Sequence, residues 1–196
     1  MARGMFSRDK VDFHVYPEFG TVDTARLIVR DVKKYLQGYD FTAQNFQTFI
    51  AVFDDDDVTS EEIFEKKLWR QLQLIHDVDK APWDPTVSHD PNDDDFSFSI
   101  GGRAFYIVGL HPYSSRQARQ SPYPAMTLNL HYQFEKLREL GIFTKVRDKI
   151  RKRDISLQGD INPMLKDFGE ESEALQYGGR QLESGWQCPF TYNKDR

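Results

Sequence analysis

Apolar residues in the middle of the chain recur at helical spacing across residues 59–78. The positions that carry this pattern are Phe64, Leu68, Leu72 and Ile75. Such spacing predicts a helix that buries one face. Thr59 and Glu62 have the separation of a capping box at its start. His76 falls in the last turn, where the helix dipole favours a cation, so we interpret it as a capping residue rather than a ligand.

Four short segments are rich in β-branched and aromatic residues, which predicts strands. They cover residues 46–53, 96–100, 103–110 and 126–130. Gly101 and Gly102 separate the second segment from the third and predict a tight hairpin turn. The hairpin brings His111 to the end of a buried strand, which is a frequent location for functional side chains.

The remaining pattern predicts three further helices and a single main domain. The helices cover residues 23–37, 131–140 and 143–153. The first lies in residues 1–45, which we interpret as an N-terminal extension with a helix, followed by the main domain at residues 46–196. Prolines break residues 81–95 into irregular chain. We therefore expect an α+β fold, with an antiparallel sheet, packed helices and a loop-rich C-terminal segment.

Composition and charge narrow the classes of function. With 196 residues, the chain is long enough to bury a full core, and an aromatic content of 14% argues against disorder. A formal charge of -5 makes a nucleic-acid partner unexpected. No apolar run approaches the roughly 18 residues of a membrane span, and the first residues lack the apolar core of a signal peptide. We therefore expect a cytoplasmic protein without a membrane partner.

The acidic and histidine residues give weak signals for a metal site. The run Asp54–Asp57 is interpreted as a solvated turn, because loops that bind hard cations space their ligands around a glycine turn that is missing here. The five histidines form no His-Glu-x-x-His pair. His131 and Glu135 are four residues apart on one predicted helix face, which fits either a surface ion pair or two ligands of a metal.

The last 60 residues contain most of the unusual residues, including the single cysteine. Cys188 precedes a proline and lies between two aromatic residues. A lone cysteine in such a setting is usually an inert small hydrophobe, but a Cys-Pro step can also present a thiolate to haem iron. His111 and His131 are the other candidate iron ligands. Four arginines can pair with haem propionates or a substrate carboxylate: Arg103, Arg116, Arg119 and Arg180.

Five ordered motifs in the chain resemble the YqcI/YcgG family. The motifs are Phe-Ser-Phe-Ser from residue 96, Gly-Leu-His-Pro-Tyr-Ser-Ser-Arg from 109, Asn-Leu-His-Tyr-Gln-Phe-Glu from 129, Gln-Gly-Asp-Ile-Asn-Pro-Met from 158 and Trp-Gln-Cys-Pro-Phe from 186. The resemblance runs from about residue 46 to residue 190. Members of this family resemble haem-dependent N-oxygenases, among them enzymes of guanitoxin and D-cycloserine biosynthesis. The resemblance implies haem b, oxygen or peroxide with a possible electron donor, and a small guanidine or amine substrate.

The resemblance turns the candidate residues into a hypothesis for the site. Haem is expected between the hairpin 96–110 and the C-terminal loop, with iron held by His131, His111 or Cys188 in no fixed order. The arginines expected to bind the cofactor are Arg103, Arg116 and Arg119, the last two at the propionates. Glu135 and Arg180 are the expected catalytic residues. The carboxylates that could bind a guanidinium in a two-point fork are Glu135, Asp160, Asp167 and Glu173.

Three positions depart from the family pattern, and two other functions remain open. Gln120 follows Arg119 where paired arginines are expected, and Leu175 and Gly178 stand where Arg and Ser are expected. If these positions touch the substrate, it differs from arginine-like molecules. The first alternative is a haem-binding or haem-sensing protein without turnover, and the second is an interaction protein without haem. A homodimer is also left open.

Overall fold

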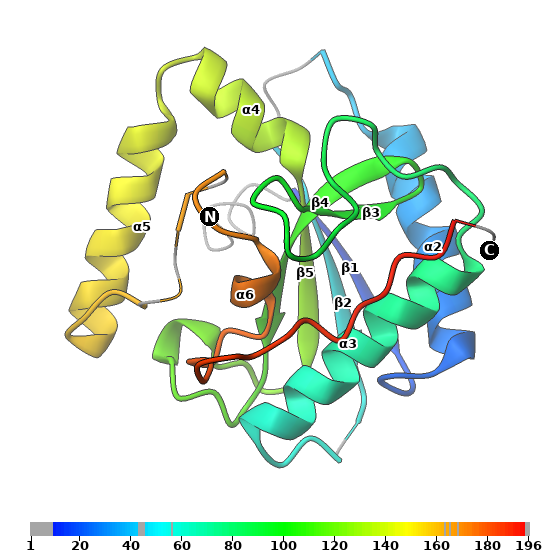
Figure 1. Cartoon of the computed structure of the whole chain (residues 1–196), viewed down its shortest axis with the longest axis horizontal. Coiled ribbons are helices and arrows are strands. Elements are labelled where there is room, and N and C mark those ends of the chain that lie inside the picture. Colours follow the sequence, from blue (N-terminus) through cyan, green and yellow to red (C-terminus); the bar gives the residue numbers. More distant parts are fainter. Residues whose placement is uncertain are drawn as a thin grey trace.

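The computed structural model describes residues 10–42, 46–55, 57–162, 164, 166–167 and 169–194. In these residues five strands form one sheet with the order β1-β2-β5-β4-β3 (Figure 1). The strands are β1 (Val11–Tyr16), β2 (Thr48–Phe53), β3 (Phe98–Ile100), β4 (Arg103–Leu110) and β5 (Ala125–Leu130). Only β1 and β2 pair in parallel, and the other neighbours are antiparallel. The predicted α+β fold with a mainly antiparallel sheet is confirmed.

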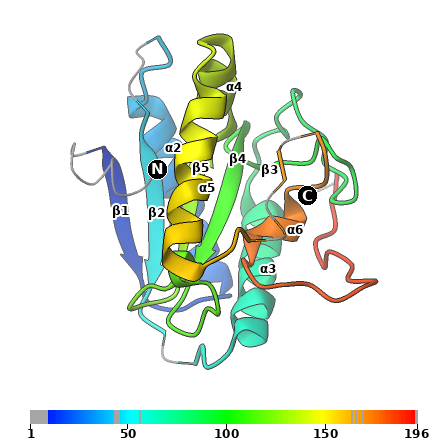
Figure 2. The same cartoon turned by 90° about the vertical axis from the view of Figure 1, so that its left-hand side faces the viewer.

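The helices divide between the two sides of the sheet. They are α2 (Val22–Gly38), α3 (Glu61–Val78), α4 (His131–Glu139), α5 (Phe143–Gln158) and α6 (Ala174–Tyr177), with a 3-10 turn η1 (Gln117–Arg119). Helices α2 and α3 contact each other and cover one face of the sheet, whereas α5 stands on the opposite side (Figure 2). None of these described helices is long and apolar enough to cross a membrane.

The predicted apolar face of α3 is confirmed, but the predicted helix cap is wrong. All four of its apolar positions are buried in the core. The N-cap is Ser60, whose hydroxyl accepts from the backbone N–H of Ile63 at 3.2 Å, so Thr59 is not the capping residue. His76 is buried, and its Nε2 accepts from the backbone N–H of Asn193 at 3.0 Å. His76 therefore links the C-terminal segment to the last turn of α3.

Residues 1–45, interpreted from sequence as an N-terminal extension, include β1 and α2 among the described residues. Strand β1 pairs with β2 along its whole length, and α2 buries Ala25, Ile28 and Val32 in the same core. The predicted helix is confirmed by α2, whereas β1 was not predicted. The sheet and the core therefore begin well before residue 46.

The acidic run after β2 is only partly a solvated turn. Asp55 is half-buried, forms an ion pair with Lys67 at 2.7 Å and accepts from the backbone N–H of Phe19 at 3.0 Å. Asp57 is exposed, with 90% of its side chain accessible. Asp56 of this run, and Pro163 of the fourth family motif, lie outside the described residues. Asp55 thus fixes the segment between β1 and α2 to the start of α3.

The side chains of each central strand alternate between the two faces of the sheet. On the face toward α2 and α3, the strands bury a continuous aromatic and aliphatic core: Phe49, Phe53, Phe105, Ile107 and Leu128. On the other face, Tyr106 and Val108 of β4 and Thr127 and Asn129 of β5 point toward α5. This second face forms the floor of the candidate site.

Candidate functional site

A pocket of ≈ 650 Å³ lies between the sheet and α5. Strands β4 and β5 form its floor, and α4 and α5 supply apolar wall residues: Phe134, Leu137, Phe143, Val146, Ile150 and Leu157. The volume falls in the range of pockets that enclose small molecules and cofactors. No described residue from 177 to 194 lines the pocket. The site is therefore formed by β4 of the predicted hairpin and by the part of the C-terminal segment that carries Glu173 and Gln176, but not by the residues around Cys188.

The pocket exists because α5 does not pack closely onto the sheet. Asp154 is the only buried residue of this helix among those described. Gly141, with φ +66°, allows the sharp turn between α4 and α5. The apolar side of α5, including Val146 and Ile150, consequently faces the pocket without closing it. A ligand with apolar faces would fill the space between this side of α5 and the sheet.

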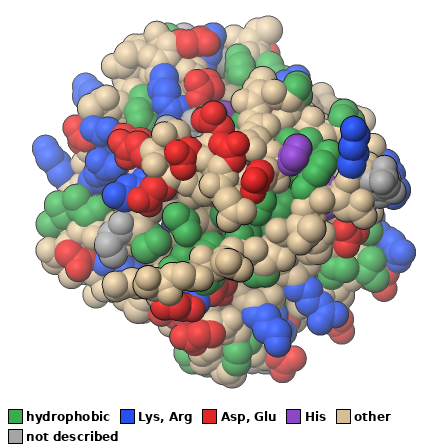
Figure 3. Space-filling model, viewed as in Figure 1, with side chains coloured by type: hydrophobic (Ala, Val, Ile, Leu, Met, Phe, Trp, Pro, Cys, Tyr) green, Lys and Arg blue, Asp and Glu red, His purple; other side chains and the backbone are tan. Residues whose placement is uncertain are grey.

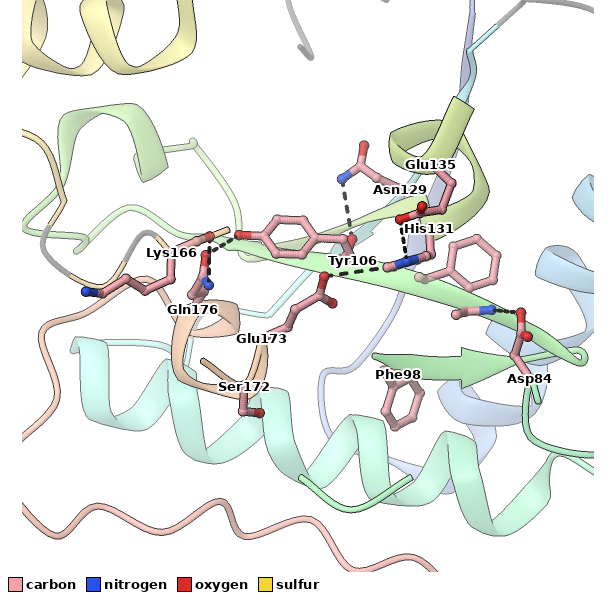
Figure 4. A network of polar contacts seen from close by, with 12 residues as sticks. Asp84, Phe98, Tyr106, Asn129, His131, Glu135, Lys166, Ser172, Glu173 and Gln176 are labelled. Atoms are coloured by element: carbon pink, nitrogen blue, oxygen red, sulfur yellow. Dashed lines mark hydrogen bonds and ion pairs between the residues drawn. The ribbon is translucent and has the colours of Figure 1, made fainter. Parts of the chain in front are cut away.

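His131 lies in the wall of the pocket, where β5 ends and α4 begins. It is 6% exposed, and its Nε2 lies 3.2 Å from Oε1 of Glu135 on the next helical turn (Figure 4). Its Nδ1 lies 3.9 Å from Oε1 of Glu173. Burial lowers the pKa of His131, so the imidazole is neutral near pH 7. A neutral imidazole is the form that binds metals.

Glu173 is a buried acid that borders the same pocket just before α6. It is 5% exposed, and its Oε2 lies 3.3 Å from the hydroxyl of Tyr177. Burial raises the pKa of Glu173 to about 8, so the group is mostly protonated at neutral pH. By contrast, Glu135 is 46% exposed at its side chain and also pairs with Arg138. The two carboxyl groups around His131 therefore differ in burial and in their partners.

A chain of hydrogen bonds orders the polar groups on the floor. The hydroxyl of Tyr106 donates to Oε1 of Gln176 at 2.9 Å, and Nε2 of Gln176 donates to the carbonyl of Lys166 at 3.4 Å (Figure 4). Nδ2 of Asn129 donates to the carbonyl of Tyr106 at 3.4 Å. Sequence reasoning missed these three side chains. The alternation along β4, which places Tyr106 on the same face as Val108, was the available signal.

Arg119 places a buried positive charge at the edge of the floor. It is 8% exposed and lines the pocket. Its Nη1 donates to the carbonyl of Gly109 at 3.1 Å, and its Nη2 donates to that of Gln176 at 3.2 Å. No carboxylate lies within ion-pair distance of it in the part of the chain that the structure describes. Burial lowers the pKa of Arg119, and an incoming anion would offset the cost of burying this charge.

Arg116 also lines the pocket, but carboxylates already neutralise it. Its Nη2 lies 2.8 Å from Oδ2 of Asp154 on α5, and its Nη1 pairs with Asp160. Asp154 additionally accepts from the backbone N–H of Asn162 at 2.9 Å. Of the two arginines expected at the propionates, Arg119 has the unmatched charge, whereas Arg116 anchors α5 to the loop after β4.

The structure separates the three residues that were expected as iron ligands. His111 lies at the opposite end of β4 from His131, fully buried, with its ring stacked on Phe64 at 4.3 Å between centroids. Cys188 lies on the C-terminal segment that runs along α3 (Figure 1). Burial raises the pKa of its thiol to about 12, so it remains protonated. Of the three, only His131 lines the pocket.

The other predicted residues mostly have partners elsewhere. Arg103 lies 4.8 Å over the ring of Phe41. Arg180 binds Glu65 at 2.7 Å and Glu183 at 2.8 Å. Neither arginine lines the pocket, so the structure does not place Arg180 where a catalytic role was expected.

The four carboxylates expected to bind a guanidinium fall into two pairs. Asp160 is taken by Arg116, and Asp167 is taken by Arg147 and Arg151 of α5. The second pair, Glu135 and Glu173, lies around His131. In the described part of the chain, no three His, Cys, Asp or Glu side chains are arranged to hold a metal ion by themselves.

Comparison with known proteins gives a family and two relatives. A model of the YqcI/YcgG family matches residues 1–191, a longer stretch than the motifs alone indicated. The uncharacterized protein YcgG of Bacillus subtilis (strain 168) is 24% identical over 163 residues, which are 76% of this chain and 63% of that protein. The uncharacterized protein YqcI of the same strain is 28% identical over 140 residues, or 68% of this chain and 55% of that protein. The matched part is thus less than two thirds of either relative. No solved structure matches the chain.

Proposed function

Because the chain belongs to the YqcI/YcgG family, we propose that it is a haem-dependent N-oxygenase. Its substrate would be a small amino-acid-like molecule with a guanidine or amine nitrogen. The observation that carries this proposal is the place of His131, a buried neutral imidazole in the wall of a ≈ 650 Å³ pocket. The family resemblance is the reason for proposing N-oxygenation, and the pocket is a site that could hold both haem and a small substrate.

The residues present fit haem in three respects. His131 offers a metal-binding nitrogen, and its neighbour Glu135 has Arg138 as an alternative partner when that nitrogen is used. The apolar sides of α4 and α5 suit a flat macrocycle. Arg119 offers a buried cation that lacks a carboxylate among the described residues, which suits a propionate. Bound haem would supply the redox chemistry of oxygen or peroxide activation, which no amino-acid side chain provides.

In this proposal the chain orients the cofactor and the substrate. The protonated Glu173 lies on the Nδ1 side of His131, where it helps to set the position of the ring. Glu135, whose Oε1 lies 3.2 Å from Nε2 of His131, offers a carboxylate beside the pocket wall that would attract a cationic guanidinium or ammonium group. The polar floor formed by Tyr106, Gln176 and Asn129 holds hydrogen-bonding groups in fixed positions, so they need not reorganise when a substrate binds.

The test begins with the absorption spectrum of protein expressed with a haem precursor. We expect a Soret band near one haem per chain, which His131→Ala should abolish or shift. Cys188→Ala and His111→Phe are the matched controls, because both side chains lie outside the pocket, and they should keep the wild-type spectrum. If wild-type protein has no Soret band even after haem titration, the proposal fails. An unchanged spectrum in His131→Ala would remove His131 as the ligand.

A second experiment tests the proposed anchoring of haem and separates the enzyme from a haem-binding protein without turnover. Arg119→Gln should weaken haem binding by about ten- to a hundredfold, because a charge-assisted contact contributes roughly 1.5–3 kcal/mol. Arg180→Gln, outside the pocket, should not weaken haem binding.

Oxidant consumption that depends on an added guanidine or amine substrate would support the oxygenase. Stable haem without such consumption would favour the binding or sensing role.

A further inference from the structure

Helix α5 carries a concentrated positive charge in a chain that is negative overall. Within Phe143–Gln158 six residues are Lys or Arg and two are Asp, while the formal charge of the whole chain is -5. Figure 3 shows these basic side chains gathered at one edge of the molecule, over α5. The sign of the charge on this helix is therefore opposite to that of the rest of the chain.

The charges on the two sides of α5 have different environments. On the side toward the pocket, Arg147 and Arg151 pair with Asp167, and the buried Asp154 pairs with Arg116. On the outer side, Lys145, Lys149 and Lys152 follow each other at intervals of four and three residues, so they share one face. All three are exposed, and none forms an ion pair with a residue that the structure describes. The excess positive charge is therefore outside the pocket.

The outer face of α5 is mainly polar, with Ile155 as its exposed apolar residue. A shallow hollow on this face is lined by Gly141, Thr144, Lys145, Asp148, Lys149, Lys152, Arg153 and Ser156. The apolar residues Val146, Ile150 and Leu157 line the pocket on the other side of the helix. A helix that inserts into a membrane surface needs a continuous apolar outer stripe, which the single exposed Ile155 does not provide. The partner that fits is an acidic protein surface.

We propose that the outer face of α5 docks an acidic electron-transfer protein. The inference rests on the proposed oxygenase function. Hydroxylation of an N–H group by O₂ takes up two electrons and two protons, places one oxygen atom on nitrogen and releases the other as water. In this proposal a separate acidic protein supplies the two electrons. Helix α5, with the roughly 10 Å diameter of a helix, is the wall between this face and the pocket.

Charge explains both the choice of partner and the expected kind of complex. Opposite potentials steer association and speed it at low salt. Electron-transfer complexes are weak and small, and they depend on such steering more than on apolar burial. Three exposed lysines in a row on a rigid helix provide this attraction next to the pocket, where the electrons are needed.

The test measures binding of two acidic probes, a bacterial [2Fe–2S] ferredoxin and a flavodoxin, by calorimetry at about 20 mM salt. The variant combines Lys145→Glu, Lys149→Glu and Lys152→Glu. We expect wild-type protein to bind at least one probe and the triple variant to bind it at least about tenfold more weakly. Added salt of about 0.3 M should weaken wild-type binding similarly, because it screens exposed charges.

The matched control makes the same change in net charge elsewhere. It combines Lys34→Glu, Lys66→Glu and Lys80→Glu, three exposed lysines of α2, α3 and the residues after α3, on the other side of the sheet. Circular dichroism confirms that both variants fold. The proposal is overturned if neither probe binds wild-type protein, or if both triple variants lose affinity equally. It is also overturned if only vesicles with phosphatidylglycerol bind to this face.

Docking and the proposed function fail in different ways. Probe binding is measured by heat and does not require haem to be present, whereas the Soret band does not require a partner. Docking without a Soret band would leave the α5 interface and remove the oxygenase. A Soret band without docking would leave the oxygenase and remove the acidic donor.

Discussion

At the scale of single residues, His111 is a buried imidazole whose polar ring atoms contribute little to the stability of the fold. It has no exposed surface, and neither ring nitrogen has a hydrogen-bond partner in the described structure. Burial lowers the pKa of His111 to about 4. Glu61 opposes this shift of the pKa and Arg119 adds to it, but burial is the largest cause. The ring behaves as an aromatic side chain packed on Phe64.

We therefore predict that His111→Phe removes part of the acid sensitivity of the fold. The folded-state pKa lies below the unfolded value of roughly 6.5, so the wild-type chain loses stability as pH falls from about 6.5 toward 4. The slope from this one group is at most about 1.4 kcal/mol per pH unit. Urea unfolding at pH 7 should show little difference between variant and wild type. At pH 5 the variant should be the more stable, and an equal difference at both pH values would contradict the prediction.

The candidate residues show what a single sequence can and cannot give at this scale. The family motifs singled out His131, the search for propionate partners singled out Arg119, and both line the pocket. The same reasoning ranked His111 and Cys188 beside them, because residue type does not reveal that one lies at the far end of β4 and the other along α3. Sequence reasoning missed Tyr106, because tyrosine is common in strands and its functional side cannot be recognised before the two faces of the sheet are known.

At the scale of elements, β4, α3 and α6 meet at a position that has no room for a side chain. A Cβ added to Gly109 would lie 2.6 Å from Cε1 of Phe64 and 2.8 Å from the carbonyl oxygen of Tyr177. The backbone of β4 can therefore approach both helices only because residue 109 is glycine. The buried ring of Tyr177 and the short helix that carries it depend on this approach.

We predict that Gly109→Ala destabilises the fold by about 1–3 kcal/mol, the usual range for overpacking. Gly38→Ala is the matched control, because a Cβ there meets nothing within 4 Å and should change the free energy of unfolding by well under about 1 kcal/mol. Urea denaturation of both variants beside wild type measures the two effects. Equal midpoints for the two variants would show that the contact relaxes without cost.

Most elements were predictable because their patterns are strong, and the exceptions have physical reasons. The helical spacing of α3 and the glycine pair between β3 and β4 led directly to the observed elements. Strand β1 alternates regularly, but its apolar residues Phe13 and Val15 are the exposed ones, and its burial comes from pairing with β2. Helix α6 has four residues, too few for any periodicity to appear.

At the scale of the whole molecule, the sheet depends on chain from both sides of residue 45. Strand β1 forms the edge beside β2 through six paired positions. Helix α2 covers that part of the sheet and contacts α3, and its Ile28 and Val32 are fully buried. The sequence did not reveal this dependence, because no apolar pattern within residues 1–45 shows which surface the segment covers. The pocket lies on the opposite face, so its floor rests on a core that α2 completes.

We therefore predict that a chain of residues 46–196 does not fold cooperatively. Its sheet would lose β1, and Phe49, which is fully buried in the whole chain, would lose its cover from α2. Each large core side chain exposed in this way costs roughly 1.5–3 kcal/mol, against a total stability of about 5–15 kcal/mol for a domain. Thermal unfolding and near-ultraviolet circular dichroism of the two chains measure the effect, and adding a 1–45 peptide should restore part of the native signal. A sharp, native-like transition in residues 46–196 alone would instead show that residues 1–45 are a dispensable extension.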